Sequence, residues 1–318
     1  MAIPEIAAAA SANALKERLK TSPKLYIGET EFVFQPVEEM DEFFTEKALK
    51  ELRETPEIRE EGYKALKELL KGEPDLYLPT EEEYLKKFLR PCKWYPKSAM
   101  EMIKRFYRYR LSHPRICNNL VPSMNREIFV SGILTPMPLR LEDGCRLLLI
   151  ESGRKWKPKE ISLEQILRGV MIILEAAMAE PITQISGVHV ILDMDGLSLS
   201  QVTYFSPSFA SAVLEWVQKC VPCRLKGVHV VNQPYIFNMV FAIFKPFLQE
   251  KLRNRLHFHG TNRQTLLSHI GVTALPTKFG GNLKIPEEPV GETLWNYFCI
   301  FEEAFQASSK CGYPPKEL

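Results

Sequence analysis

Apolar positions recur at two different spacings along the chain, and the change falls near Gly144. Within residues 46–110 they return at helical spacing, as Leu66 and Leu70 do, and Thr80-x-x-Glu83 predicts a capping box at a helix start. Beyond Gly144, short strand-like runs alternate with segments of helical period. Strands that alternate with helices form mainly parallel sheets covered by helices. The sequence therefore predicts a helical bundle followed by an α/β domain.

The boundaries of these parts follow from breaks in the pattern. The expected strands and helices of the α/β part are, in order, 145–151, 163–179, 188–193, 207–220, 227–231, 234–254 and 256–259. Four prolines between His113 and Leu141 predict a linker or wrapping loop, namely Pro114, Pro122, Pro136 and Pro138. The expected division is an N-terminal extension at 1–45, a helical domain at 46–112, the α/β domain at 113–285 and a C-terminal segment at 286–318.

The most informative stretch is residues 224–255, where a short strand is followed by a run that is apolar at almost every position. This run is too short to span a bilayer, and Lys245 and Pro246 interrupt it. It either lies in a core, covers a cavity or rests on a membrane surface. Four basic residues flank it and are able to converge on one anionic head group: Arg224, Lys226, Lys251 and Arg255. The alternative is a buried helix with a solvated basic end.

Composition narrows the functional classes. The 318 residues, with 45% hydrophobic and 25% charged residues, are typical of a globular protein. A net charge of +2 is too small to indicate bulk nucleic-acid binding, so electrostatic function would come from local clusters. The first residues, MAIPEIAAAASANALKER, resemble neither a secretory signal nor an anchor. Seven scattered cysteines fit reduced thiols, and we expect a cytoplasmic protein.

The candidate chemical motifs favour structural roles. Cys220-Val-Pro-Cys223 is a C-x-x-C, but it ends a helix rather than starting one, where the helix dipole would lower a thiol pKa. His257-x-His259 places two imidazoles on one strand face without a third ligand nearby in the sequence. Asp193-x-Asp195-Gly196 lacks the other oxygens of a calcium loop. Nucleotide-binding and nucleophile-elbow motifs do not occur. We therefore expect no enzyme, no cofactor and no metal.

Four segments resemble, in order, the CRAL-TRIO lipid-binding family: GCRLLLIESGRKWKPKE, GVHVILDMDGLSLSQ, CRLKGVHVVNQPYIFNMVFAIFKPFLQEKLRNRLHFHG and LPTKFGGNL. The resemblance extends over roughly Leu49 to Leu283. It implies a helical domain followed by an α/β domain whose sheet and helices enclose a hydrophobic pocket. It also implies a mobile lid helix within Asn232 to Arg255 that opens at membranes.

The resemblance assigns two sets of residues. The pocket wall would be Leu167, Val170, Leu174, Val188, Leu192, Leu197, Phe205, Val213, Trp216 and Val221, with Phe237, Val240, Phe241 and Phe244 from the lid. The phosphoinositide-binding positions would be Arg224, Lys226, Lys251 and Arg255, which we call the basic cluster. Val170 and Leu174 replace two serines of a tocopherol-carrying family member, Leu197 replaces a tryptophan, and Cys92 replaces an arginine. A buried tocopherol hydroxyl without a partner would cost about 1–3 kcal/mol, so these departures disfavour tocopherol itself.

The resemblance implies a carrier rather than a catalyst. It would bind one hydrophobic lipid, such as a tocopherol, a retinoid, a carotenoid or a related isoprenoid, and transfer it at phosphoinositide-containing membranes. Such a carrier would be cytoplasmic and peripheral on membranes, with a monomer favoured and no nucleic-acid partner. The alternative is a membrane-trafficking adaptor that uses the same domain to read phosphoinositides.

Overall fold

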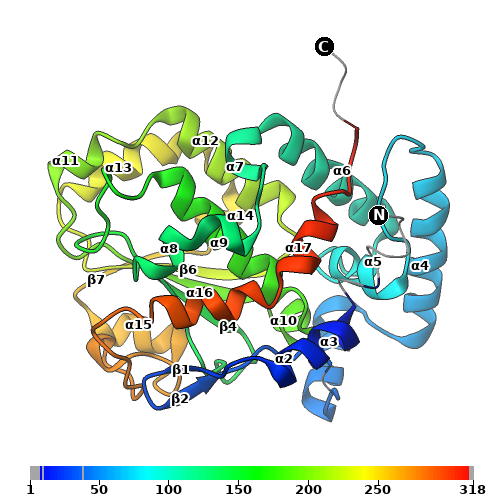
Figure 1. The fold of residues 1–318 in the computed structure, drawn as a ribbon, viewed down its shortest axis with the longest axis horizontal. Helices are drawn as coiled ribbons and strands as arrows, with labels where there is room; N and C mark the ends of the chain where they lie inside the picture. Colours follow the sequence, from blue (N-terminus) through cyan, green and yellow to red (C-terminus); the bar gives the residue numbers. More distant parts are fainter. Residues whose placement is uncertain (1–7, 9–10, 38, 315–318) are drawn as a thin grey trace.

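The computed structural model describes residues 8, 11–37 and 39–314 and is built around a five-stranded sheet (Figure 1). Its strands lie side by side in chain order: β3 (Leu134–Pro136), β4 (Arg146–Glu151), β5 (Val188–Asp193), β6 (Leu225–Val231) and β7 (Leu256–Gly260). β3 is antiparallel to β4, and β4 to β7 run parallel. The predicted α/β class with a mainly parallel sheet is confirmed.

Both faces of the sheet are covered, and the period of two along each strand decides which side chains meet which cover. On β5, Val190 faces the same side as Val188, while His189 and Ile191 face the other. Helices α9 (Leu163–Ala177), α12 (Pro207–Glu215) and α13 (Phe237–Phe244) lie over the first face, and α15 (Arg263–Ile270) lies over the second (Figure 1). The first face is the one that bounds the site described below.

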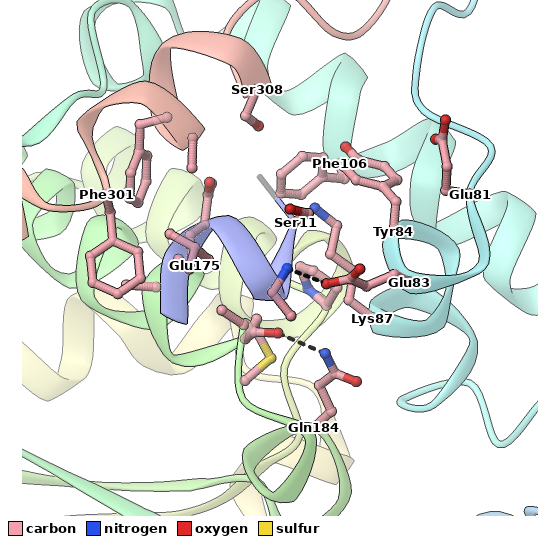
Figure 2. A pocket seen from close by; sticks show the side chains of 18 of the residues that line it. Ser11, Glu81, Glu83, Tyr84, Lys87, Phe106, Glu175, Gln184, Phe301 and Ser308 are labelled. Carbon is pink, nitrogen blue, oxygen red and sulfur yellow. Dashed lines mark hydrogen bonds between the residues drawn. The ribbon is translucent and has the colours of Figure 1, made fainter. Parts of the chain in front are cut away.

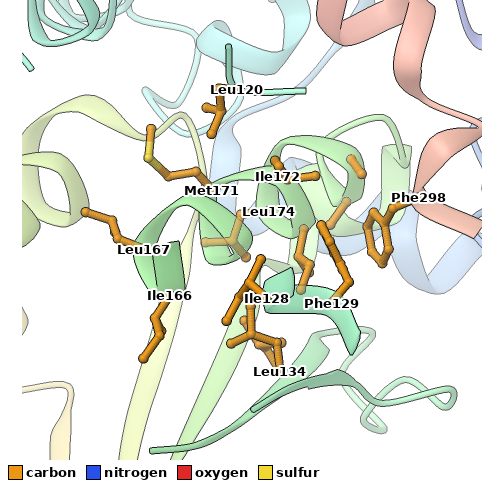
Figure 3. Close-up of a cluster of buried hydrophobic side chains, with 14 of the residues drawn as sticks. Leu120, Ile128, Phe129, Leu134, Ile166, Leu167, Met171, Ile172, Leu174 and Phe298 are labelled. Carbon is orange, nitrogen blue, oxygen red and sulfur yellow. The ribbon is translucent and has the colours of Figure 1, made fainter. Parts of the chain in front are cut away.

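Helix α9 anchors the main core. Its N-terminus is fixed by a capping box in which Ser162 and Gln165 satisfy each other's backbone N–H groups. Figure 3 shows α9 side chains meeting Phe129 of α8 (Arg126–Val130) and Phe298 of α16 (Glu292–Cys299). Gly169 allows α9 to lie close to β3, because a Cβ there would lie 2.5 Å from a Leu134 methyl carbon. The helix is thus held on one side by the core and presents its other side to the sheet.

A separate bundle has its own core. It comprises α3 (Glu42–Leu52), α4 (Pro56–Lys71), α5 (Glu82–Leu89) and α6 (Pro96–Ser112) (Figure 1). Arg90 joins it to the α/β part, since its guanidinium pairs with Glu54 at 2.8 Å and donates to Gln184 at 2.8 Å. The predicted capping box at Thr80 is wrong. The helix begins at Glu82, so Thr80 precedes the N-cap residue and its hydroxyl does not cap the helix.

The expected loop between His113 and Leu141 is wrong as well, because the segment forms α7 (Pro114–Cys117), a 3-10 turn (Pro122–Asn125), α8 and β3. Pro114 and Pro122 begin their turns, where the missing N–H of proline costs no hydrogen bond. The Arg168 guanidinium donates to the backbone carbonyls of Ile116 and Asn118, each at 2.8 Å. Pro114 and Pro122 thus start short helical turns instead of marking a loop, and Arg168 of α9 holds the segment in place.

The two ends of the described chain pack together. The N-terminal part forms α2 (Ala12–Thr21), β1 (Leu25–Ile27) and β2 (Thr30–Phe32), and the C-terminal part forms α16 and α17 (Glu302–Ser308). Arg18 pairs with Glu303 at 2.5 Å, and the Phe34 N–H donates to the Tyr297 hydroxyl at 2.9 Å. Figure 1 shows these blue and red segments side by side. The expected extension therefore wraps the main core, although residues 1–7 and 9–10 lie outside the description.

Candidate functional site

An apolar cavity of about 260 Å³ lies between the sheet and helices α9, α12 and α13. The predicted wall residues that line it are Leu167, Val170, Leu174, Val188, Leu192, Phe205, Val213, Trp216, Val221, Phe237, Val240, Phe241 and Phe244. Leu197 is the exception. It follows β5 and belongs to the buried cluster that also contains Met194, Phe237 and Val240, which do line the cavity. The structure thus brings together all but one of the predicted wall residues, while ligand binding by them stays a prediction.

Several lining residues were not predicted. They are Ile150, Ser152, Leu163, Ile166, Val190, Met194, Phe209, Leu214, Val217, Cys223, Leu225, Val228, Val230, Leu248, Leu252, Leu256 and Phe258. Strand alternation was a usable signal for some of them, because Val190 lies between the predicted Val188 and Leu192 on the same face. Others, such as Leu248, line the cavity only because the chain turns after α13, which the sequence pattern does not show. Ser152 carries the one hydroxyl among the described lining residues.

Trp216 gives this apolar wall a polar feature. It begins a π-helical turn, Trp216–Cys220, that continues α12, so the predicted single α-helix over 207–220 is wrong in its last turn. The indole is 2% exposed, and its Nε1–H has no hydrogen-bond partner among the described residues. Buried tryptophan N–H groups usually find a partner.

The predicted helix over 234–254 is broken into three pieces: α13, a 3-10 turn (Lys245–Phe247) and α14 (Glu250–Arg253). Pro246 is the physical reason, since it has no N–H to continue the helical ladder. α13 turns Phe237 and Val240 inward, while Tyr235 is 91% exposed and Met239 is 52% exposed. The lid thus carries apolar residues on both its cavity side and its outer side. No helix among the described residues is long and apolar enough to cross a membrane.

The lid begins at a fixed point. Asn232 follows β6 with a left-handed backbone (φ 52°) and donates from Nδ2 to Asp193 Oδ1 at 2.9 Å. Its Oδ1 accepts a hydrogen bond from Arg263 at 2.8 Å. Asp193 also accepts from the Asp195 N–H at 3.1 Å, which agrees with the expected turn after the strand. The lid therefore leaves the sheet from a hydrogen-bonded corner.

The basic cluster is brought together around the start of β6 and the start of β7. Burial lowers the pKa of Lys251, and the nearby charges of Arg255, Lys93 and Arg224 lower it further. Burial and then Arg224 likewise lower the pKa of Arg255. Lys93, which sequence reasoning left uncounted, thus lies close enough to join the cluster. The position equivalent to the lost arginine, Cys92, also lies within electrostatic range of Lys251.

One acidic residue opposes this positive charge. Glu51 of α3 lies 2.7 Å from Arg224 Nη2 and 3.3 Å from Lys226 Nζ, and Lys47 pairs with its other oxygen at 3.0 Å. Burial alone would raise the pKa of Glu51, but hydrogen bonds from Arg224 and Lys47 lower it to about 2. Glu51 therefore stays ionised at neutral pH. Nothing in the sequence pattern indicated this partner, because it comes from the helical bundle.

The remaining motifs take structural positions. Burial raises the pKa of Cys220 and of Cys223 to about 12, so both thiols are protonated at neutral pH and unsuited to dithiol chemistry. The fold brings a third imidazole to His257 and His259 that is not near them in the sequence, since His229 Nδ1 lies 3.0 Å from His259 Nε2. The strand register places β6 beside β7, which the local sequence does not reveal.

A second cavity, of about 410 Å³, lies between α2, α5, the end of α9 and α17. Figure 2 shows Lys87 and Glu175 among its lining side chains, with Ser11 of the N-terminal segment across it. Burial lowers the pKa of Lys87 to about 8. This cavity has polar and charged walls, whereas the smaller cavity between the sheet and the lid is almost wholly apolar. A hydrophobic lipid fits the smaller one better.

Comparisons with known proteins identify relatives of this chain. Residues 134–281 match the model of the CRAL/TRIO domain, and this range contains every lining residue of the apolar cavity. The alpha-tocopherol transfer protein-like protein of Homo sapiens is 34% identical over 272 residues, which cover 83% of this chain and 79% of the relative. Clavesin-1 of Mus musculus is 30% identical over 242 residues, covering 75% of this chain and 68% of the relative. The solved structure of Sfh5 aligns at 17% identity with a TM-score of 0.41, over 63% of this chain and 70% of that chain. The identity to these relatives over most of the chain shows that the protein belongs to the CRAL-TRIO family of lipid-binding proteins.

Proposed function

We propose that the protein is a carrier that holds one hydrophobic lipid in the apolar cavity and transfers it at phosphoinositide-containing membranes. The observation that carries this proposal is the cavity itself, which α13 bounds on one side and which is lined almost wholly by apolar side chains. Burying roughly 500 Å² of lipid at about 25 cal/mol per Å² contributes about 12 kcal/mol, enough to offset association costs. Shape and exclusion of water then provide affinity without catalysis.

The ligand class follows from the lining. A tocopherol, a retinoid, a carotenoid or a related isoprenoid presents a long apolar surface and at most a few oxygens, which suits this wall. The unpartnered Trp216 N–H favours a ligand with one acceptor oxygen near the π-helical turn. Val170 and Leu174 line the cavity as apolar groups, so an oxygen at their end of the ligand is disfavoured.

Transfer at a membrane is supported by the lid and the basic cluster together. Tyr235 and Met239 place apolar groups on the outer surface of the lid, where an interface would bury them. Each basic group near an anionic surface contributes about 1 kcal/mol, so the basic cluster would select the membrane. A cytoplasmic monomer that associates peripherally with membranes and carries out no chemical reaction fits these features.

Extraction of the purified protein with organic solvent, followed by mass spectrometry, tests the proposal. We expect one neutral isoprenoid for each protein chain. Val213→Phe is the matched control, because a larger ring on the α12 wall of the cavity should sharply reduce the recovered lipid if that lipid occupies the cavity. Recovery of a phospholipid, or of no lipid from a protein that binds phosphoinositide vesicles, would contradict the carrier and favour a phosphoinositide-reading trafficking adaptor.

A further inference from the structure

A chain of imidazoles crosses the face of the sheet opposite the apolar cavity. His189 Nδ1 on β5 lies 2.9 Å from His229 Nε2 on β6, and His229 Nδ1 lies 3.0 Å from His259 Nε2 on β7. The chain ends at the hydroxyl of Thr265, 2.8 Å from His259 Nδ1. His229 is fully buried. We call His189, His229 and His259 the imidazole chain.

Gly227 is what allows the rings to meet. It pairs with His189 across β5 and β6, and a Cβ at this position would lie 2.7 Å from His229 Nε2 and 2.8 Å from His189 Nδ1. No side chain fits there without pushing the two rings apart. A glycine inside a strand commonly marks such a close approach, and here it preserves the contact between the two nitrogens.

One arrangement of protons satisfies every contact of the chain. The Thr265 hydroxyl lies 2.9 Å from the carbonyl oxygen of Asn262, which only accepts, so Thr265 donates there and accepts from His259 Nδ1–H. His259 Nε2 then accepts from His229 Nδ1–H, and His229 Nε2 accepts from His189 Nδ1–H. In this arrangement Nε2 of His189 carries a lone pair.

Two further metal-ligand groups lie beside His189. A carboxylate oxygen of Asp143, the Sγ of Cys145 and a ring nitrogen of His189 all lie within 4.8 Å of one another. We propose that these three residues form a site for a divalent transition-metal ion, with Zn²⁺ the ion that their donors suit. Zn²⁺ takes thiolate, imidazole and carboxylate ligands, usually in a tetrahedron, and water would complete the fourth position.

The surroundings fit a metal ion. One thiolate and one carboxylate neutralise the two charges of the ion, so the bound site is electrically neutral in a partly buried place. On binding, Cys145 releases its proton to solvent and its sulfur forms the bond to the metal. The hydrogen bond from His189 to His229 fixes the tautomer of the ligand, as second-layer partners of metal-bound histidines do. Ser186, fully buried beside Gly144, has a hydroxyl without a partner among the described residues.

The positive charges near the site, which would oppose the binding of a metal cation, are paired with a carboxylate. Lys47 and Lys226 lie close enough to act on Cys145, but both pair with Glu51 at 3.0 and 3.3 Å. The Cys145 Sγ lies 3.2 Å from both Asp143 Oδ2 and the Ser186 carbonyl oxygen, while a thiol has one proton for two acceptors. Replacing that proton by a metal ion turns the Asp143 contact into shared ligation.

Titration of the reduced full-length protein with Co²⁺ tests the site. We expect binding of one equivalent with a thiolate-to-cobalt charge-transfer band in the near ultraviolet, and displacement of the Co²⁺ by Zn²⁺. Cys145→Ser should abolish the band, and Asp143→Asn should weaken Co²⁺ binding about tenfold or more. The control Cys299→Ser removes a thiol on α16 and should change neither result. Circular dichroism checks that each variant is folded.

The outcomes separate this site from others. A band that persists in Cys145→Ser would place the metal at another cysteine and overturn the proposal. Stoichiometric binding without any thiolate band would assign the metal to histidines such as His257 and His269, whose rings lie 4.2 Å apart, and would also overturn it. If Cys145→Ser fails to fold, Asp143→Asn tests the site instead, because Asp143 is only partly buried. Unchanged Co²⁺ affinity in Asp143→Asn would contradict a three-residue site.

Discussion

Arg224 and Glu51 come from different parts of the chain, yet Nη2 of Arg224 lies 2.7 Å from Oε2 of Glu51. Arg224 begins the approach to β6, and Glu51 lies near the end of α3. The carboxylate also contacts Lys226, so it occupies two of the four cations of the basic cluster. A phosphoinositide head group would have to compete with Glu51 for them.

Removing the competitor should strengthen membrane binding. Glu51→Gln frees Arg224 and Lys226 from an anion, and a gain of about 1 kcal/mol corresponds to roughly fivefold tighter binding to phosphoinositide vesicles. Vesicle co-sedimentation measures the change. Glu46→Gln, one turn earlier on α3 and paired only with Lys50 in the described ion pairs, serves as the control and should leave vesicle binding unchanged. Weaker binding by Glu51→Gln would mean that Glu51 positions the cations instead of competing for them.

Charge reversal at the other half of the cluster should have the opposite effect. The double variant Lys251→Glu and Arg255→Glu should abolish binding to phosphoinositide vesicles, because it replaces two attractive charges by two repulsive ones. The affinity for the lipid ligand should stay within a few fold, since neither residue lines the cavity. Lys16→Glu with Lys20→Glu, also four residues apart on exposed positions of α2, is the matched control. Unchanged vesicle binding by the Lys251→Glu and Arg255→Glu variant would show that the basic cluster does not bind phosphoinositides.

The wall formed by Val170 and Leu174 should select against tocopherol. Serine at both positions restores hydroxyls and should raise the affinity for α-tocopherol by about 1 kcal/mol or more, the size of one recovered buried hydrogen bond. Lost apolar contact offsets part of this gain. Fluorescence titration of both proteins with α-tocopherol measures the difference. Val217→Ser places a hydroxyl on the π-helical turn that also lines the cavity and should bring no gain. Nanomolar binding by the wild type without improvement in the double variant would contradict the selection.

Dithiol chemistry should play no part in lipid transfer. Cys220→Ala removes one member of the C-x-x-C and leaves Cys223, which lines the cavity, in place. Because Cys220 is 1% exposed and burial raises its pKa to about 12, we expect a transfer rate between vesicles close to that of the wild type. Loss of transfer in a folded Cys220→Ala protein would revive a redox function.

The Glu54–Arg90 pair should make stability depend on acid pH. Burial alone would raise the pKa of Glu54, but hydrogen bonding to Arg90 lowers it below its ordinary value of 4.5. The pair therefore stabilises the fold above about pH 4.5, and this contribution is lost as the pH falls through the lowered pKa. Glu54→Gln leaves Arg90 buried without its counter-charge and should cost about 3 kcal/mol at pH 7. Urea unfolding measures the difference in the free energy of unfolding between the wild type and Glu54→Gln, and this difference should be smaller at pH 3 than at pH 7. The control Glu60→Gln, at an exposed position, should match the wild type at both pH values.

The spacing of apolar residues predicted those strands and helices that bury one face along their whole length. The strands at 188–193 and 256–259 and the stripe of α9 were predicted because alternation and helical spacing reflect burial on one face. Prediction failed where a proline has two possible roles. Pro114 and Pro122 start turns, whereas Pro246 ends a helix, and the local pattern alone does not distinguish these cases. The domain boundaries at 45, 112 and 285 stay predictions.

The cavity wall was largely predictable, but the contacts between distant segments were not. Glu51 beside Arg224, and His189 beside His229, depend on how α3 and β5 are placed against β6. Leu197 lies in the cluster beside the cavity and outside its lining, because family likeness fixes a position in the chain but not the depth of a side chain. Gly227 was read only as the start of a strand, although its missing side chain is what brings two rings together.

The turn at Lys245–Phe247 separates the lid helix from α14, which carries Lys251. In the proposed carrier, a membrane would hold the charged end through its head groups while the apolar helix moved separately. Docking and opening would then be two kinetic steps: ionic strength would change the time spent at the membrane surface, and acyl-chain packing would change the rate of lipid exchange. A carrier with one unbroken helix here would have to dock and open in a single movement.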